Sequence, residues 1–281
     1  MKSLRFFKPT LATTLAIVLA WLLSVRAAEA AVADFNGDGH PDFLLWNFNT
    51  QQTAVFFLNN NVANGSVFGP TLPFPWLLRP GADFNGDGHT DCTLVNFDTG
   101  QTVIVYLSGT TVVGFAFGPS LPDLGWDLVA AADFNGDGHP DYLLRGPTGE
   151  TMIEYLNNNL VIGTAFGPTL PAGWGLVGAA DFNGDGHPDC VVVNPPGEFT
   201  GGGQTAIVYL SGSTVIGVAP GPTIPPSWVV SGIDDFDGDG HPDFLLYNFN
   251  TRETAIDYLS NNILVNAAMG PTLEFGWVFA F

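Results

Sequence analysis

The sequence predicts an all-β protein, and within that class a β-propeller of five four-stranded blades. Three observations lead to this fold: five copies of one acidic loop within 281 residues, a spacing of about fifty residues between copies, and short apolar segments separated by Gly, Pro and Asn turns. About fifty residues and four strands make one propeller blade, and five blades lie within the usual range of roughly four to eight. The alternative architecture is an open, partial propeller that a second chain completes.

The acidic loop has the sequence Asp-Phe-Asn-Gly-Asp-Gly-His-Pro-Asp or a close variant. Its copies start at Asp34, Asp83, Asp133, Asp181 and Asp235. The spacings are 49, 50, 48 and 54 residues, and self-similarity at a nearly constant period indicates a repeat architecture. The longer fourth spacing contains a Pro- and Gly-rich stretch at 195–203, which predicts a lengthened loop between two strands. Residues 31–281 are therefore expected to form a single array.

Within the third repeat we expect strands at residues 142–144, 151–156 and 160–166, with 176–180 leading into the next loop. The turn at Asn157-Asn158-Asn159 contains residues that tolerate a positive φ, as a tight antiparallel hairpin requires. Several strands are apolar on both faces, which predicts that each small sheet is covered on both sides. Residues 275–281 copy the segment that precedes each loop, so they are expected to supply or reinforce the first strand of the first blade; residues 31–33 are the alternative.

The N-terminus has the pattern of a secretory signal peptide. Lys2, Arg5 and Lys8 precede an apolar run at residues 11–23, and Ala28-Glu29-Ala30 predicts cleavage after Ala30. The run is shorter than the roughly 20 apolar residues that a membrane anchor needs, and no later segment is long enough to span a bilayer. We therefore expect residues 1–30 to be removed and residues 31–281 to be secreted or displayed at the cell surface.

The charge balance excludes one class of partner. The chain has 27 acidic and 7 basic residues and a net charge of −20, so the phosphates of nucleic acid would repel it. Residues 31–281 have 3 basic and 26 acidic residues, which gives −23, and 16 of those acids lie in the five loops. The acidity is thus concentrated where a cation could bind.

The loop chemistry is that of a hard cation. Oxygen-bearing side chains at loop positions 1, 3, 5 and 9, with glycine at position 6 for a sharp turn, suit Ca²⁺. The expected side-chain ligands are Asp34, Asn36, Asp38 and Asp42; Asp83, Asn85, Asp87 and Asp91; Asp133, Asn135, Asp137 and Asp141; Asp181, Asn183, Asp185 and Asp189; and Asp235, Asp237, Asp239 and Asp243. Position 7 is expected to contribute a backbone carbonyl, from His40, His89, His139, His187 and His241.

We expect up to five calcium ions, with the tightest site in the fifth loop, where Asp237 replaces asparagine. No glutamate stands at position 12, which indicates an affinity on the order of 10⁻⁴ M or somewhat tighter, as in extracellular modules. An ordinary Asx-turn explains the Asp, Asn and Gly residues of one loop. It does not require carboxylates at positions 5 and 9 in all five copies. Magnesium suits these loops less, because it prefers smaller and more rigid shells.

The histidines and cysteines have simpler interpretations. A whole repeat separates each histidine from the next, so zinc binding and acid–base catalysis are disfavoured. Cys92 and Cys190 occupy equivalent places in the second and fourth repeats, two blades apart, and a disulfide needs Cα atoms within about 7 Å. We expect two buried free thiols.

One tryptophan precedes the loop-leading strand in each repeat, and repeated aromatic residues either pack between blades or stack on sugar rings. These residues are Trp76, Trp126, Trp174, Trp228 and Trp277. Packing is the interpretation we favour, and the ligand-binding interpretation remains open.

Phe-Gly-Pro at Phe68, Phe117 and Phe166, followed after the tryptophan by a small-residue pair and the acidic loop, resembles the FG-GAP/VCBS repeat family over the whole of residues 31–281. The resemblance implies the propeller fold of integrin α-subunit heads and of a group of fungal lectins, with calcium between the first and second strands of a blade. Those relatives form seven blades, whereas this chain has five repeats.

The sequence thus predicts a secreted, non-catalytic, calcium-binding propeller for adhesion or ligand binding, with an extracellular protein or glycan as its partner. A lectin with sites between blades is the alternative, and a polysaccharide-acting enzyme is a third hypothesis. Against catalysis, the chain has no nucleophile elbow, metalloprotease helix or phosphate loop. Acids outside the loops that could act in an enzyme are Glu150, Glu154, Glu198, Glu253, Asp257 and Glu274.

Overall fold

The computed structural model describes residues 32–79, 81–194 and 202–280. The predicted signal peptide at 1–30 and most of the predicted inserted loop, residues 195–201, lie outside the described residues. The described residues form 21 β-strands. No helix among them is long and apolar enough to cross a membrane.

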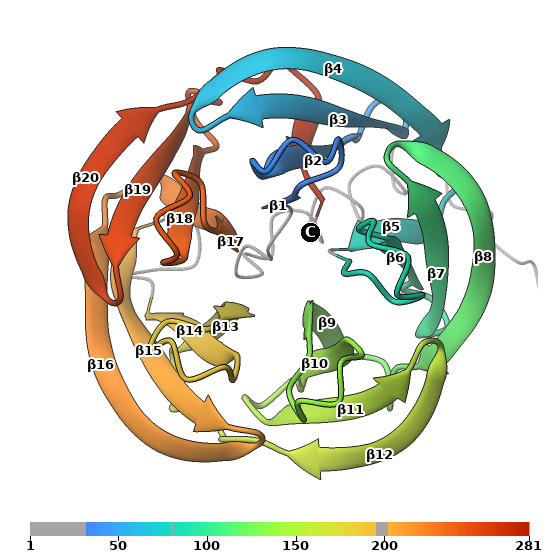
Figure 1. Cartoon of the computed structure of the whole chain (residues 1–281), viewed down its shortest axis with the longest axis vertical. Helices are drawn as coiled ribbons and strands as arrows, with labels where there is room; N and C mark the ends of the chain where they lie inside the picture. The colour runs from blue at the N-terminus through green and yellow to red at the C-terminus, as the bar shows by residue number, and fades with distance from the viewer. Residues whose placement is uncertain (1–31, 80, 195–201, 281) are drawn as a thin grey trace, which may run out of the picture.

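The strands form five antiparallel sheets arranged in a ring around a central axis, so the predicted five-bladed propeller is confirmed (Figure 1). In each blade consecutive strands pair as a meander, with the first strand near the axis and the fourth on the perimeter (Figure 1). Blade 1 contains β1 (Val32–Ala33), β2 (Asp42–Asn47), β3 (Gln52–Asn59) and β4 (Val62–Thr71). Blade 2 contains β5 (Trp76–Arg79), β6 (Cys92–Asn96), β7 (Gln101–Ser108) and β8 (Thr111–Ser120).

The other three blades repeat this pattern. Blade 3 contains β9 (Asp127–Ala132), β10 (Asp141–Arg145), β11 (Thr151–Asn157) and β12 (Leu160–Phe166). Blade 4 contains β13 (Gly175–Ala180), β14 (Asp189–Asn194), β15 (Gly203–Ser211) and β16 (Thr214–Ile224). Blade 5 contains β17 (Trp228–Asp234), β18 (Asp243–Asn248), β19 (Thr254–Ser260) and β20 (Ile263–Met269). The strands predicted for the third repeat match β10 to β13 within one residue at nearly every boundary.

Both ends of the described chain close the ring by pairing with one strand, β2. The strand β1 pairs with the first half of β2, through Val32 and Phe43. The last strand, β21 (Trp277–Phe279), pairs with the second half of β2, through Phe279 and Leu45. The sequence left open which end would serve as the inner strand of blade 1, and the two ends share that place. The open-propeller alternative therefore does not apply.

The hydrophobic core is divided among the interfaces between neighbouring blades. Separate clusters of buried side chains join blades 2 and 3, blades 3 and 4, and blades 4 and 5, and a larger one joins blade 1 to blades 5 and 2. The second strand of each blade is buried on both faces, as its continuous apolar sequence predicts. Each blade is thus stabilised by packing against both neighbours.

A threonine ties the third strand of every blade to the Gly-Pro segment of the fourth. In blade 1 the hydroxyl of Thr53 donates to the carbonyl of Pro70 over 2.7 Å. The same bond recurs in the other blades at 2.6–2.7 Å. A Cβ atom at Gly69 would overlap the Thr53 hydroxyl, and the equivalent glycines are crowded in the same way. The recurring Gly-Pro pair therefore has a packing reason.

The two cysteines are free and buried, as predicted. Cys92 packs in the cluster that contains blades 1 and 2, and Cys190 in the cluster between blades 3 and 4. Burial, together with a smaller effect of the carboxylate that precedes each in the sequence, raises the pKa of both thiols to about 12. Both side chains act as small hydrophobic groups.

Candidate metal-binding loops

The five acidic loops connect the first and second strands of their blades, so all five lie at the same end of the ring. Phenylalanine at loop position 2 is buried in each of them and anchors the loop in the core between blades. In the first loop Gly37 and Gly39 have φ values of 76° and 87°, which glycine adopts without strain. The loops therefore present a short, sharply turned backbone above buried aromatic anchors.

The aspartate at position 1 organises the turn. In the first loop the Asp34 carboxylate accepts backbone N–H bonds from Gly37, Asp38 and Gly39. The same three bonds occur in the other four loops, and their lengths lie between 2.7 and 3.2 Å in all five. Position 1 is therefore fixed in place before any cation binds.

Positions 3 and 5 face each other across the loop. In the first loop the Asn36 amide Nδ2 donates to Asp38 Oδ2 over 3.1 Å, and Asn36 Oδ1 accepts from the Asp38 backbone N–H. The second, third and fourth loops share this arrangement. In these four loops an amide donor thus partly compensates the carboxylate at position 5.

The fifth loop lacks that amide donor, because Asp237 occupies position 3. Asp235, Asp237 and Asp239 each place one carboxylate oxygen within 4.8 Å of the others. Three carboxylates at this separation repel one another unless a cation lies between them. This group is the strongest candidate metal site among the described residues.

The aspartate at position 9 has a different environment. In the first loop Asp42 Oδ2 accepts the Phe35 backbone N–H and Asp42 Oδ1 accepts that of Leu58 at the end of β3, both over 3.0 Å. The same pair of bonds recurs in all five blades at 2.8–3.1 Å. All five of these side chains are fully buried. Position 9 therefore fastens the loop to the third strand, and whether it also binds a cation stays a prediction.

Burial perturbs the position 9 carboxyl groups. It raises the pKa of Asp42, Asp141 and Asp189 to about 6 and that of Asp243 to about 7, and raises the pKa of Asp91 above its ordinary value. Acids at other loop positions raise these pKa values further, while the two backbone N–H bonds lower them. A nearby divalent cation would favour the charged forms of these groups.

The histidine at position 7 turns its backbone N–H toward the aspartate at position 5. In the first loop the His40 N–H donates to Asp38 Oδ1 over 3.1 Å, and the other loops repeat this bond. Each of the five histidines belongs to a different blade. A role through the backbone carbonyl stays a prediction.

The residues present fit a calcium ion. Positions 1, 3 and 5 bring carboxylate or amide oxygens to one exposed turn, and such oxygen donors in a flexible loop are the ligands that Ca²⁺ takes. In the first four loops the position 3 amide would present its oxygen to the ion in place of its present contact with position 5. The ion would neutralise the carboxylates and hold the exposed half of the turn.

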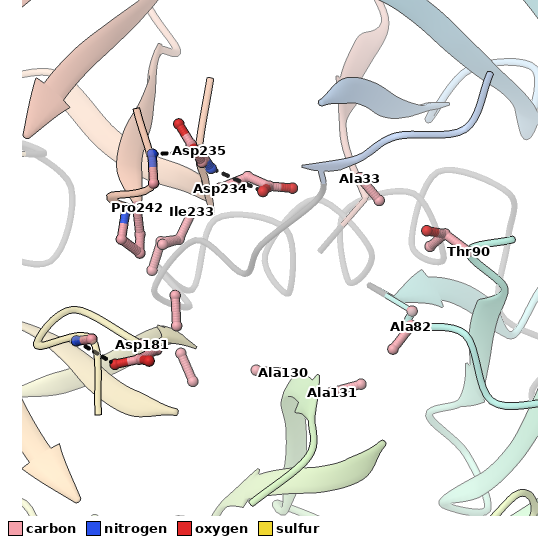
Figure 2. A pocket seen from close by; sticks show the side chains of 15 residues that line it. Ala33, Ala82, Thr90, Ala130, Ala131, Asp181, Ile233, Asp234, Asp235 and Pro242 are labelled. Carbon is pink, nitrogen blue, oxygen red and sulfur yellow. Dashed lines mark hydrogen bonds between the residues drawn. The ribbon is translucent and has the colours of Figure 1, made fainter. Parts of the chain in front are cut away.

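An axial pocket lies beside the loops, with a volume of about 420 Å³ (Figure 2). Small side chains from the inner strands, including Ala33, Ala130 and Ala131, line much of it (Figure 2). Asp181, Asp234 and Asp235 line the side formed by blades 4 and 5 (Figure 2). The pocket is therefore acidic on one side and nearly apolar on the other.

Asp234 was not identified from the sequence. It stands immediately before the fifth loop, where the other repeats have Ala33, Ala82, Ala132 and Ala180, and this comparison would have revealed it. Its Oδ1 accepts the Asp235 N–H over 2.9 Å. Burial raises the pKa of Asp234 to about 6, and the carboxylates of Asp235 and Asp34 add to the increase.

A buried ion-pair network near the axis was also not predicted from the sequence. Arg79 of blade 2 lies 2.9 Å from one oxygen of Asp127 of blade 3, and Arg145 lies 3.4 Å from the other. Arg145 also donates to the carbonyl of Leu176 in blade 4. The network joins three blades, and no spacing within a single repeat indicates it.

The five tryptophans are half-buried. Trp277 stacks against Phe68 with ring centroids 5.9 Å apart, and Trp126 lies close to Gly146. Trp126, Trp174, Trp228 and Trp277 also pack against the hydrophobic clusters between blades, so packing is shown for four of the five side chains.

Four-stranded blades with an acidic turn between the first and second strands define the chain as a repeat β-propeller. The model of the FG-GAP-like repeat matches residues 83–144, 133–192 and 181–246, which together span more than half of the sequence. The chain belongs to the FG-GAP-like repeat family. No curated protein matches it.

Several solved structures are similar to the chain at low identity. One is a protein of unknown function from Bacteroides caccae, with 11% identity, coverage of 81% of this chain and 72% of that chain, and a TM-score of 0.41. The β-propeller domain of Cps50 (Swd1) from Myceliophteria thermophila has 14% identity, 89% coverage of each chain and a TM-score of 0.41. The Tc holotoxin pore of Photorhabdus luminescens has 17% identity and a TM-score of 0.43; the match covers 79% of this chain but only 11% of that one.

Proposed function

We propose that the chain is a secreted, non-catalytic, calcium-binding β-propeller that serves adhesion or ligand binding outside the cell. The group formed by Asp235, Asp237 and Asp239 carries the calcium part of the proposal, since three converging carboxylates without an amide donor call for a cation. Four further loops with nearly the same sequence and hydrogen bonds support up to five ions.

Calcium would act as a structural ligand in this proposal. Positions 1, 3 and 5 would hold it with side-chain oxygens, position 7 with a carbonyl, and position 9 from the buried wall of the loop. Neutralising the acidic end of the ring would reduce repulsion among neighbouring loops and allow a partner to approach. An extracellular protein or a glycan is the proposed partner, and the basic and apolar pattern of residues 1–30 supports secretion.

The arrangement of acids outside the loops supports a non-catalytic role. Glu154 and Asp257 are buried at equivalent positions of β11 and β19. Each is paired with a residue of the adjacent second strand, Glu154 with Tyr142 and Asp257 with Phe244. Because these strands belong to blades 3 and 5, the two acids do not form the paired carboxylates that glycoside hydrolysis uses. Glu150 bonds to Thr148 at an exposed turn.

A lectin is the second candidate, and the half-exposed tryptophans favour it. The same residue recurs on all five blades, so the ring would present several equivalent aromatic surfaces to a branched or repeating glycan. Glycan-array binding in calcium, compared with binding in chelator, separates a lectin from a protein-binding propeller.

The calcium proposal is tested by isothermal titration calorimetry and thermal melting of residues 31–281. We expect a saturable binding heat and a higher Tm in millimolar calcium than in chelator. Asp239→Ala should remove part of the heat, whereas Asp98→Ala, at an exposed acid outside the loops, should not. Identical melting curves in calcium and chelator would disprove the proposal.

A further inference from the structure

The perimeter of the ring is an uncharged apolar surface. The fourth strands β4, β8, β12, β16 and β20 form this outer belt and follow one another around the circumference (Figure 1). None of the five contains Asp, Glu, Lys, Arg or His. Each is an edge strand of its sheet. Edge strands of soluble proteins usually carry charges or other features that prevent pairing with another chain, so an uncharged apolar edge is a site of association.

The apolar surface is largest where blades 2 and 3 meet. We define the belt patch as Val112, Val113, Phe115 and Phe117 of β8 with Leu160, Val161 and Ile162 of β12. These seven side chains are 44–68% exposed. Asn159 Nδ2 donates to the carbonyl of Phe117 over 2.9 Å, which fixes the start of β12 against the end of β8. The patch is therefore continuous across the two blades.

We propose that the belt patch is the interface of a two-fold symmetric homodimer. Each exposed side chain contributes roughly 100 Å², so seven give on the order of 700 Å² per partner. That area is close to the roughly 800 Å² per partner of a standard interface, whereas isolated exposed hydrophobic residues need no partner. Phe115 and Phe117 add the aromatic side chains that contribute most to interface energies.

Charge directs a second copy to the perimeter. The acidic loops occupy one end of the ring, and exposed acids such as Asp98, Asp123 and Glu274 lie in turns at the other end. Two copies therefore repel each other end to end, while the uncharged belt allows them to meet side by side. A two-fold axis through the patch places the same seven side chains on both sides of the contact, which makes the contact self-complementary.

The patch on blades 2 and 3 is preferred over the equivalent patches elsewhere. Blade 1 has Asn64 and Ser66 in β4, and blade 4 has Val218 and Pro220 where blade 2 has Phe115 and Phe117. The other patches thus offer polar groups or smaller side chains. A single preferred patch gives a closed dimer and not an open chain of rings.

Sedimentation equilibrium and multi-angle light scattering of residues 31–281 in calcium test the proposal. We expect a dimer that dissociates on dilution. Phe115→Lys and Ile162→Lys should each weaken self-association about tenfold or more, because each places two like charges in the dry interface. Leu124→Lys is the matched control: Leu124 is 64% exposed but lies outside the belt, so this variant should dimerise as the wild type does.

Melting curves of the variants show whether each still folds, and Phe115→Lys and Ile162→Lys provide independent tests if one does not. A wild-type chain that stays monomeric at all soluble concentrations would overturn the proposal, as would variants that dimerise unchanged. Binding of a different protein or a glycan to the patch of a monomeric chain would also overturn it, by assigning the patch to another partner. Each outcome is separate from the calcium result, since Phe115→Lys and Ile162→Lys change no residue of the acidic loops.

Discussion

Phe279 pairs with Leu45, so a strand from the end of the chain completes the sheet that begins it. The Phe279 side chain is fully buried, and its ring centroid lies 5.0 Å from that of Phe43 and 5.5 Å from that of Tyr247. The same residue therefore joins blade 5 to blade 1 through both backbone and side-chain contacts. Closure of the ring depends on this small region.

Replacing Phe279 with alanine should destabilise the whole ring. The cavity left among buried aromatic side chains predicts a loss of about 3–5 kcal/mol in the free energy of unfolding. Urea unfolding followed by fluorescence measures it. Phe275→Ala is the matched control, since Phe275 is 72% exposed and should cost much less. Equal losses for the two variants would show that closure does not rely on Phe279.

Mutations at positions 5 and 9 of the same loop should have different effects on stability in chelator and in calcium. Asp141→Ala leaves the buried N–H groups of Phe134 and Leu156 without their acceptor, at about 1–3 kcal/mol each, so stability should fall even in chelator. Asp137→Ala, at an exposed position of the same loop, should leave the stability in chelator nearly unchanged and lower only the gain from calcium. Thermal melting with and without calcium measures both, and equal effects in chelator would contradict this division of roles.

Asp237→Asn should have opposite effects in the absence and presence of calcium. The new amide can donate to Asp239, as Asn36 does to Asp38, which relieves carboxylate repulsion and should raise the Tm in chelator. Removing one charged ligand should weaken calcium binding in the fifth loop. Calorimetry and melting curves check the two parts, with Asn183→Asp in the fourth loop as the reciprocal variant, expected to change both quantities in the reverse direction.

Glu154 should make the folded chain less stable as the pH rises. Burial raises its pKa to about 7, and its Oε2 atom has no hydrogen-bond partner among the described residues. The folded state holds the Glu154 proton more tightly than the unfolded state does. Protonation of Glu154 therefore adds to the free energy of unfolding. This added stability is complete below the unfolded pKa and is lost as the pH rises through about 7.

Glu154→Gln removes the ionisable group and should stabilise the chain at pH 8 by on the order of 1–3 kcal/mol. The same variant should have little effect at pH 4, where glutamate is already protonated. Urea unfolding at both pH values measures the difference. Glu253→Gln, at a turn of blade 5, is the control, and the same pH dependence in both variants would contradict the assignment to Glu154.

The sequence predicted the architecture because each blade repeats a local pattern. A loop every fifty residues, alternating turns and doubly apolar strands are all local features, and the strands of the third repeat follow from them. The free cysteines followed from their equivalent positions in two repeats. The sequence did not decide how the ring closes, since either end of the chain could supply the inner strand of blade 1. In the structure both ends pair with β2.

The site was predicted in part, for a related reason. Spacing places positions 1, 3 and 5 around one turn, but it does not show that position 9 bonds to the end of the third strand, some sixteen residues away in blade 1. Polar contacts between blades were not predicted: Arg79 and Asp127 are 48 residues apart, and nothing in either repeat pairs them.

Different positions of each loop have different structural roles, and this has an evolutionary consequence. The acid at position 9 secures the blade through two backbone bonds, while positions 1, 3 and 5 shape the exposed turn. A duplicated repeat could therefore lose its proposed cation ligands by drift and still fold, provided that position 9 and the buried phenylalanine remain. Selection on ion binding and selection on folding act on different residues of the same nine, so individual blades are free to acquire new surfaces while the ring persists.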